Sequence, residues 1–193
     1  MTDDRLKRSL RSALVAEITA AFDGVPLGGG VTLHQARSMD DYEYEWAQLA
    51  ARSRDAEARW QDVAEDKLRE LHDVHPFLDP EGFRFYIPAF MIWVLRHLDD
   101  ETDEHRGLNC STIYSFKTGQ PSDPWHSDQR ERFALLNPQQ SRSVCGFLRH
   151  LARYDPSSRE DAESFLAAYW GRFCPEAATP APAEQTPARR PGA

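Results

Sequence analysis

The stretch "FLDPEGFRFYIPAFMIWVLRHL", residues 77–98, contains the longest uninterrupted apolar run of this 193-residue chain. Asp79 followed by Pro80 is typical of a helix start, because aspartate caps a first turn and proline fits the first helical position. The spacing predicts a helix that runs to about Leu98, with large apolar side chains on both of its sides. A helix that is apolar all round is a buried one, so we expect the rest of the fold to pack around it.

Pro88 stands in the middle of this helix. A proline inside a helix costs about 3 kcal/mol, because it removes one hydrogen bond and clashes with the preceding turn. Burial of each large apolar side chain contributes about 1.5–3 kcal/mol, which is enough in sum to offset that cost. We therefore expect one kinked helix. Two short helices joined near Tyr86 and Ile87 are the alternative.

A kink at Pro88 would free backbone carbonyls beside Arg84, and these carbonyls need other donors. Arg84 and Tyr86 are therefore the first candidates for a ligand-binding pocket. His34 and Asp40 follow a run of three glycines and are candidates for a segment that closes this pocket. Two alternatives stay open: Arg84 pairs with a carboxylate that lines the core, and the glycine run is simply a flexible connector.

The remaining periodic segments predict a mainly α, single-domain bundle of about six helices around this central helix. We expect the domain to cover residues 1–173 and the proline- and alanine-rich tail, residues 174–193, to be disordered. Residues 99–110 read as an acidic loop. A weak alternation of polar and apolar residues also allows one small hairpin between residues 111–116 and 132–136. The other predicted helices cover residues 3–23, 38–53, 60–74, 137–154 and 157–173.

Composition excludes several classes of function. The formal net charge is −8, whereas nucleic-acid binders usually carry a basic face, so we expect no nucleic-acid partner. The longest apolar run, residues 87–95, is far below the ~20 residues of a membrane span. The N-terminus lacks the basic end and apolar core of a signal peptide, and the sequence therefore predicts a cytoplasmic protein.

The chain has three cysteines, Cys110, Cys145 and Cys174, which lie far apart in the sequence. A disulfide scaffold or a zinc motif needs closer spacing or more ligands. We expect three free thiols. No nucleotide-binding or cofactor motif is present either, so the sequence predicts no cofactor.

Two further groups of polar residues are weaker candidates for sites. His72 and His75, with Glu65 two turns before them, are residue types that hold divalent metals, although the spacing matches no known metal motif. Histidines near a helix end are also favoured simply by the helix dipole. The segment "PWHSDQRERF", residues 124–133, mixes aromatic and charged side chains and reads either as the lip of a binding site or as a solvated loop.

Two motifs support a resemblance to a known family. The segment "FLDPEGFRFYIPAFM" is followed by "RFALLNPQQSRSVCGFL", and together they resemble an uncharacterised bacterial family known only as a domain of unknown function. The resemblance covers roughly residues 10–152. It implies no reaction and no catalytic residues.

The sequence leaves three functional hypotheses. The first is a non-enzymatic binding or regulatory protein, similar to immunity or accessory proteins, whose acidic surface binds a basic protein partner. The second is a small enzyme or ligand-binding protein with a pocket near Arg84 and Tyr86. The third is a metal-binding protein that uses His72 and His75.

Overall fold

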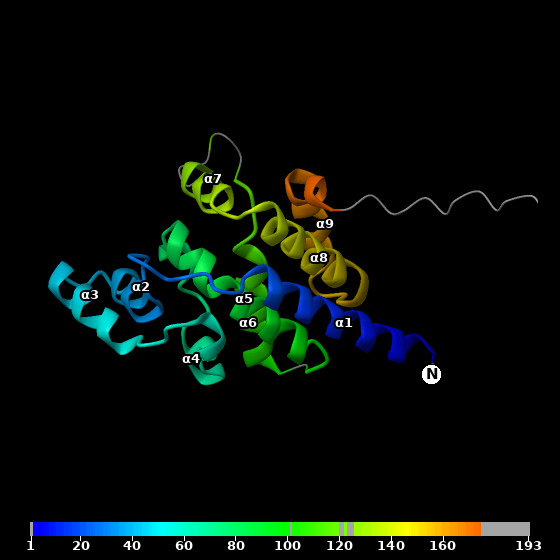
Figure 1. The fold of residues 1–193 in the computed structure, drawn as a ribbon, viewed down its shortest axis with the longest axis horizontal. Coiled ribbons are helices and arrows are strands. Elements are labelled where there is room, and N and C mark those ends of the chain that lie inside the picture. Colours follow the sequence, from blue (N-terminus) through cyan, green and yellow to red (C-terminus); the bar gives the residue numbers. More distant parts are fainter. Residues whose placement is uncertain (1, 101, 120–121, 123–125, 175–193) are drawn as a thin grey trace, which may run out of the picture.

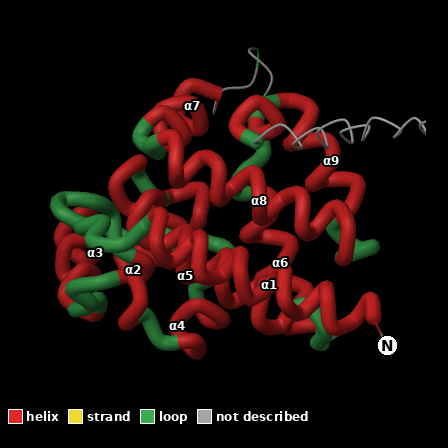
Figure 2. Tube along the Cα trace, turned by 45° about the vertical axis from the view of Figure 1, so that its right-hand side comes forward, coloured by secondary structure: helices red, strands yellow, loops and turns green. Residues whose placement is uncertain are grey.

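In the computed structural model, which describes residues 2–100, 102–119, 122 and 126–174, the chain folds into α-helices joined by short loops and 3₁₀ turns (Figures 1 and 2). The described ranges contain nine α-helices and no strand, which confirms the mainly α single-domain class. None of these helices is long and apolar enough to cross a membrane. The helices are α1 (Thr2–Ala21), α2 (Leu33–Asp40), α3 (Glu45–Ala51), α4 (Glu65–Glu70), α5 (Pro80–His97), α6 (Asp103–Tyr114), α7 (His126–Ala134), α8 (Pro138–Tyr154) and α9 (Arg159–Ala168).

Helix α5 is the centre of the fold, as its sequence predicts. Every residue from Phe85 to Leu95 is buried, and α1, α4, α6 and α7 pack against it. The Asp79 side chain caps the helix by accepting a hydrogen bond from the Gly82 backbone N–H at 2.8 Å. The helix continues through Pro88. The prediction of a single helix is therefore confirmed, and the alternative of two short helices is wrong.

Helix α8 forms the second layer, between α1 and α9. Asn137 and Gln140 form a capping box at its start, and Pro138 occupies the first helical position. The sequence predicts this boundary correctly. The buried side of α8 carries Val144, Phe147 and further apolar residues, which extend the core that begins at α5.

The prediction of a small hairpin is wrong, because both of its segments lie in or next to helices. Residues 111–114 belong to α6, and residues 132–134 belong to α7. The predicted acidic loop is largely the first part of α6, which begins after the cap Thr102. Leu108, Thr112 and Phe116 recur at four-residue spacing and are buried, which is a helical pattern and not the alternation of a strand.

Three predicted helices are broken in the structure. The segment 38–53 contains the end of α2 and all of α3, which meet at a turn where Tyr42 has a positive φ of 56°. The segment 60–74 holds the 3₁₀ turn η2 (Trp60–Asp62) and α4. The segment 157–173 holds α9 and the 3₁₀ turn η4 (Trp170–Phe173). The predicted disordered tail lies outside the described residues, apart from Cys174.

The glycine run is packed and is not a free connector. Gly30 lies so close to Gly82 that a Cβ at residue 30 would stand 2.6 Å from the Gly82 backbone nitrogen. The Arg52 guanidinium donates to the carbonyls of Gly28 and Gly30, and Asp79 accepts from the backbone N–H of Val31 at 2.8 Å. The run therefore joins α1 to α2 along a path that the start of α5 determines.

The expectation of three free thiols is also wrong. Cys145 on α8 and Cys174 after η4 form a disulfide with a Cα–Cα distance of 5.5 Å, and only Cys110 is free in the described chain. The two cysteines are 29 residues apart, so their spacing carries no signal that they meet. Packing of η4 and α9 against α8 brings them together.

Candidate functional site

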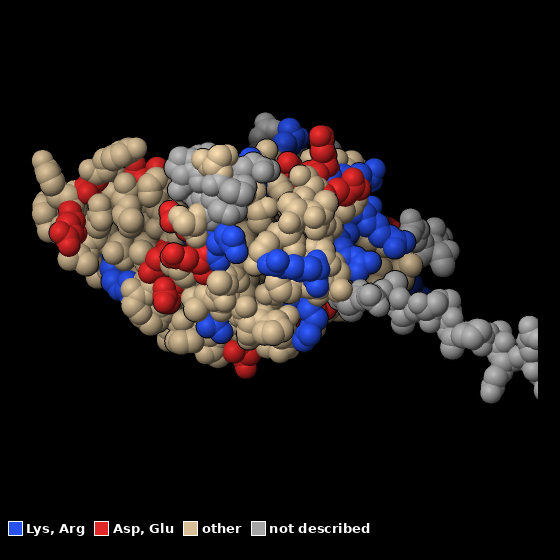
Figure 3. Space-filling view, turned by 90° about the horizontal axis from the view of Figure 1, so that it is seen from above, with Lys and Arg blue, Asp and Glu red and all other residues tan. Residues whose placement is uncertain are grey.

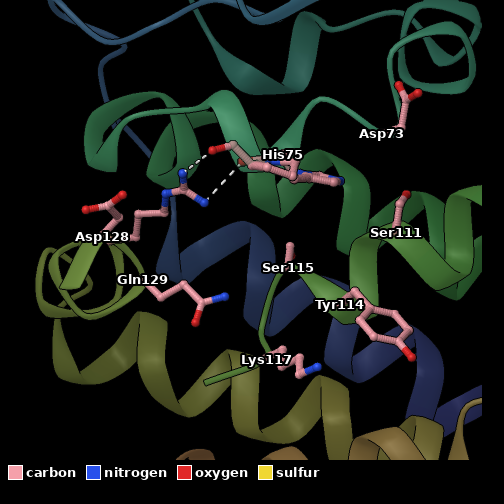
Figure 4. Close-up of a pocket in the computed structure, with 10 residues that line it drawn as sticks. Asp73, His75, Ser111, Tyr114, Ser115, Lys117, Asp128 and Gln129 are labelled. Atoms are coloured by element: carbon pink, nitrogen blue, oxygen red, sulfur yellow. Dashed lines mark hydrogen bonds between the residues drawn. The ribbon is translucent and has the colours of Figure 1, made fainter. Parts of the chain in front are cut away.

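A pocket of about 480 Å³ opens between α6, α7 and the 3₁₀ turn η3 (His75–Phe77) that precedes α5 (Figure 4). This volume lies within the range of about 300–1,000 Å³ that is usual for small-molecule sites. Each of the three elements contributes polar side chains or backbone to the wall. The lining residues are Asp73, His75, Pro76, Ser111, Tyr114, Ser115, Lys117, Asp128, Gln129 and Arg132.

His75 is the most unusual of these residues. Its side chain is only 3% exposed, and its ring packs edge-on against Phe90 of α5 with the centroids 4.4 Å apart. Neither ring nitrogen has a hydrogen-bond partner among the described residues. Burial, assisted by the nearby charge of Arg132, lowers the pKa of His75 to about 3. The imidazole is therefore neutral near pH 7 and offers one unused donor and one unused acceptor.

Arg132 connects α7 to the turn that carries His75. Its guanidinium donates to the backbone carbonyl of His75 at 3.2 Å and to that of Pro76 (Figure 4). Burial lowers the pKa of Arg132, although the carboxylates of Asp128 and Asp79 act against this. Within the described ranges Arg132 forms no ion pair, so its positive charge is not neutralised by direct contact.

The last turn of α6 and the residues directly after it supply hydroxyl groups and a cation. Ser111 donates to the carbonyl of Leu108 at 3.1 Å, and Ser115 donates to that of Thr112 at 2.6 Å, so both hydroxyl oxygens can still accept. Lys117 extends past the Tyr114 ring, with its Nζ 5.7 Å from the ring centroid. On the opposite wall, Arg37 binds the carboxylate of Asp73 and neutralises it.

The pocket combines groups that can recognise a ligand. It combines a neutral buried imidazole, two cations that form no ion pair within the described chain, accepting hydroxyls and an aromatic wall. Nucleophilic catalysis uses a hydroxyl or thiol hydrogen-bonded to a base, and no described hydroxyl of this pocket bonds to His75.

Two of the predicted ligand-binding residues, His34 and Tyr86, lie at a different place, a buried ionic cluster around Asp55. His34 Nδ1 lies 2.8 Å from one Asp55 oxygen, and the His34 backbone N–H donates to the other at 2.8 Å. Lys67 Nζ lies 2.9 Å from Asp55 and also binds Glu57. Burial alone would raise the pKa of Asp55, but the hydrogen bonds from Lys67 and His34 outweigh it and lower that pKa.

Tyr86 is fully buried near this cluster. Burial raises the pKa of its hydroxyl, and the charges of Asp55 and Glu57 raise it further. The structure thus places His34 and Tyr86 around Asp55, which the sequence did not single out. Their arrangement joins α2, α4 and α5 and is part of the folded core.

The other two predicted ligand-binding residues lie elsewhere. Arg84 Nε donates to the side-chain oxygen of Gln140 on α8 at 3.1 Å, so its partner among the described residues is an amide and not the expected carboxylate. Gln140 in turn donates to the carbonyl of Ala21 at 3.2 Å, which links α5, α8 and α1. Asp40 pairs with Arg37 on α2 at 3.0 Å. Neither Arg84 nor Asp40 lines the pocket at His75.

The three metal candidates do not come together. Glu65 lies 3.7 Å from Arg96 and 3.9 Å from His97, and His72 Nδ1 donates to the carbonyl of Arg69 at 2.7 Å. His75 is enclosed separately in the pocket wall. Among the residues whose placement is described, no three His, Cys, Asp or Glu side chains are arranged to hold a metal ion.

The segment 124–133, expected as either a lip or a solvated loop, contributes Asp128, Gln129 and Arg132 to the pocket. Its residues 124 and 125 lie outside the described ranges. Sequence reasoning missed Ser111 and Tyr114, because it allowed residues 111–116 to form one strand of a small hairpin, and it missed Lys117, which follows that segment. It named His75 only as a metal candidate and missed its burial in the pocket wall, since a histidine before a proline carries no signal of burial.

One comparison with known proteins is informative. A family described as a family of unknown function, DUF6714, matches residues 10–173, which include every residue of the pocket. The chain belongs to this family. The resemblance to a domain of unknown function is confirmed, and the DUF6714 match extends beyond residue 152 to include α9 and η4. No curated protein and no solved structure matches.

We expect His75 to make this DUF6714 protein sensitive to acid. In the unfolded chain an ordinary histidine takes up a proton below about pH 6.5, whereas folded His75 stays neutral down to a pKa of about 3. The free energy of unfolding should therefore fall as the pH decreases from 6.5 to 3, by about 1.4 kcal/mol per pH unit. At pH 5 the expected loss from His75 is about 2 kcal/mol.

Urea unfolding at pH 7 and pH 5 measures this loss. His150 is also buried with its pKa lowered to about 4, so the wild type loses stability from both histidines. His75→Phe should remove only the His75 part, which is the difference between the two pH profiles. Identical losses in wild type and His75→Phe would contradict the assignment.

Proposed function

We propose that this protein is a non-enzymatic, cytoplasmic binding protein that holds a small organic ligand in the pocket of His75 and Arg132. The observation that carries the proposal is the buried imidazole of His75, which stands on the pocket wall with both nitrogens unpaired in the described chain. An unpaired buried polar group costs about 1–3 kcal/mol. Both nitrogens are buried in the ligand-free structure, so a small movement of the pocket wall would have to expose one of them. A ligand that then hydrogen-bonds to the imidazole would recover part of that cost on binding.

The lining supports one class of ligand, a small organic acid with an apolar body. Lys117 and Arg132 provide positive charge for a carboxylate, while Tyr114 and Pro76 offer an apolar surface. His75 would bind a hydroxyl or amide group of the ligand. The carboxylate of Asp128 would repel a second negative charge on the ligand, so the pocket should favour monoanions over dianions.

A panel of paired ligands tests this proposal. The panel contains aromatic and branched aliphatic carboxylic acids that carry a hydroxyl or amide group, each matched with its neutral primary amide. Ligand-observed NMR identifies binders and calorimetry measures their affinity. We expect acids to bind, and His75→Phe to weaken them about tenfold through the lost hydrogen bond.

Two variants separate charge recognition from shape. Lys117→Gln should weaken each acid but leave its amide partner unchanged, and Asp128→Asn should strengthen the acids. Arg130→Gln on the exposed part of α7 is the control, since Arg130 does not line the pocket. Acids that bind wild type and His75→Phe equally well would overturn the proposal.

The protein partner that the net charge of −8 predicts is a separate proposal. It concerns the acidic surface and not this pocket, whose described lining carries charges of both signs.

A further inference from the structure

An exposed aromatic patch projects from the end of the molecule formed by α2 and α3. It consists of Tyr42, Tyr44, Trp46 and Leu49, which are 92%, 78%, 72% and 59% exposed. Helix α3 buries none of its residues, and its main neighbours are α2 and the 3₁₀ turn η1 (Arg52–Arg54). Clustered exposed aromatic side chains mark interaction sites more often than single ones do.

The patch is held in place and carries negative charge. Ser38 donates to the Glu43 carboxylate, and Gln48 donates to the Glu43 carbonyl at 2.8 Å, so the turn before α3 is tied at both ends. Asp41, Glu43 and Glu45 are exposed between the aromatic residues. In Figure 3 this end of the molecule, on the left, shows uncharged and acidic side chains side by side.

A groove with the complementary character runs between α1, α8 and α9. It has a volume of about 620 Å³ and an aliphatic floor that includes Leu10, Leu14 and Leu166. Arg142, Arg149 and Arg153 line it from α8.

The arginines outnumber the acids of this groove. Their spacing of seven and four residues places the three on one side of α8, and none forms an ion pair with the described chain. Glu17 and Glu163 are the two acids in the lining. Figure 3 shows Lys and Arg side chains gathered on the right-hand part of the molecule, away from α3. The groove therefore has an apolar floor and a positively charged border.

We infer that the groove of one molecule receives the aromatic patch of a second copy of this chain. The carboxylates of the patch match the arginines of the groove, and guanidinium groups stack favourably on aromatic rings. The two surfaces lie at opposite ends of one molecule, so they cannot meet within a single chain (Figure 1). Pairing of two patches is disfavoured, because it would oppose Asp41, Glu43 and Glu45 with their own copies.

This contact is heterologous, since it joins two different surfaces. Each added copy exposes one free patch and one free groove, so association proceeds head to tail and depends on concentration. The patch is small, and interfaces below about 1,200 Å² are usually weak. We therefore expect reversible association with a dissociation constant on the order of micromolar to millimolar.

Sedimentation velocity and light scattering of the full chain test this inference between about 10 μM and 1 mM. The Cys110→Ser background avoids cross-linking through the exposed free thiol. The average mass should rise with concentration above the 22.1 kDa of one chain, and high salt should reduce it. Trp46→Ala, which removes the centre of the patch, and Arg149→Glu, which reverses charge in the groove, should each stay monomeric.

Mixing these two variants gives the sharpest result. Trp46→Ala keeps its groove and Arg149→Glu keeps its patch, so one contact can form between them and no further one. The mixture should reach twice 22.1 kDa and stop there. Arg130→Glu, which changes an exposed residue outside both surfaces, should associate like the background protein. A monomer at every concentration, or a mixture that stays monomeric, would overturn the inference.

Discussion

Replacing Asp55 with alanine is expected to lower the free energy of unfolding by about 3–5 kcal/mol, the usual effect of removing one partner from a buried ion pair. The Asp55 side chain is completely buried and binds His34 twice and Lys67 once. Without it, the His34 backbone N–H loses its acceptor, and Lys67 keeps a carboxylate partner in Glu57.

Chemical denaturation at pH 7 measures the effect. Asp55→Asn should recover part of the lost stability, because an amide keeps one acceptor while losing the charge. The matched control is Asp62→Ala, which removes a carboxylate paired with Arg59 on the surface and should be close to wild type. If Asp55→Ala were as stable as Asp62→Ala, the cluster would not contribute to holding α2 and α4 on α5.

Opening the Cys145–Cys174 disulfide is expected to cost about 3–4 kcal/mol of stability. The bond closes a segment of 29 residues, and the entropy that such a cross-link removes from the unfolded chain corresponds to this value. The same bond holds the end of η4 against α8, so α9 and η4 should become the least protected part of the fold when it is reduced.

Unfolding with and without a reductant measures this cost. Cys174→Ser should match the reduced protein and should not respond to reductant. Cys110→Ser is the control and should respond like wild type, since Cys110 is not part of the bond. Titration of the unreduced, unfolded chain should find one thiol. A finding of three thiols in protein purified under air would show that the pair does not oxidise.

The central helix could be predicted because its signals are local. Asp79, Pro80 and Gly82 lie within four residues and form the N-terminal cap by themselves. The apolar residues after them exceed what one face of a helix needs, which requires burial wherever the helix sits. The same reasoning holds for Asn137, Pro138 and Gln140 at the start of α8.

The wrong predictions for residues 111–116 and 38–53 have a common cause. The local sequence pattern in each segment is weak, and tertiary contacts decide its structure. Residues 111–116 alternate slightly, but the cap at Thr102 and burial of Leu108 and Phe116 make them helical or the end of a helix. The helix expected across residues 38–53 breaks at Tyr42, because bonds between Ser38 and Glu43 hold a turn there. Propensity is a weak preference that tertiary contacts override.

By itself the sequence determined that this protein is built around one buried helix, where that helix begins and how α8 starts. These features depend on residues within a few positions of one another. Only the tertiary structure decided which polar groups meet: His75 with the pocket of Arg132, Asp55 with His34 and Lys67, and Cys145 with Cys174. Each of these contacts joins residues that lie far apart in the sequence. No local sequence pattern predicts such contacts, because they depend on how separate elements pack.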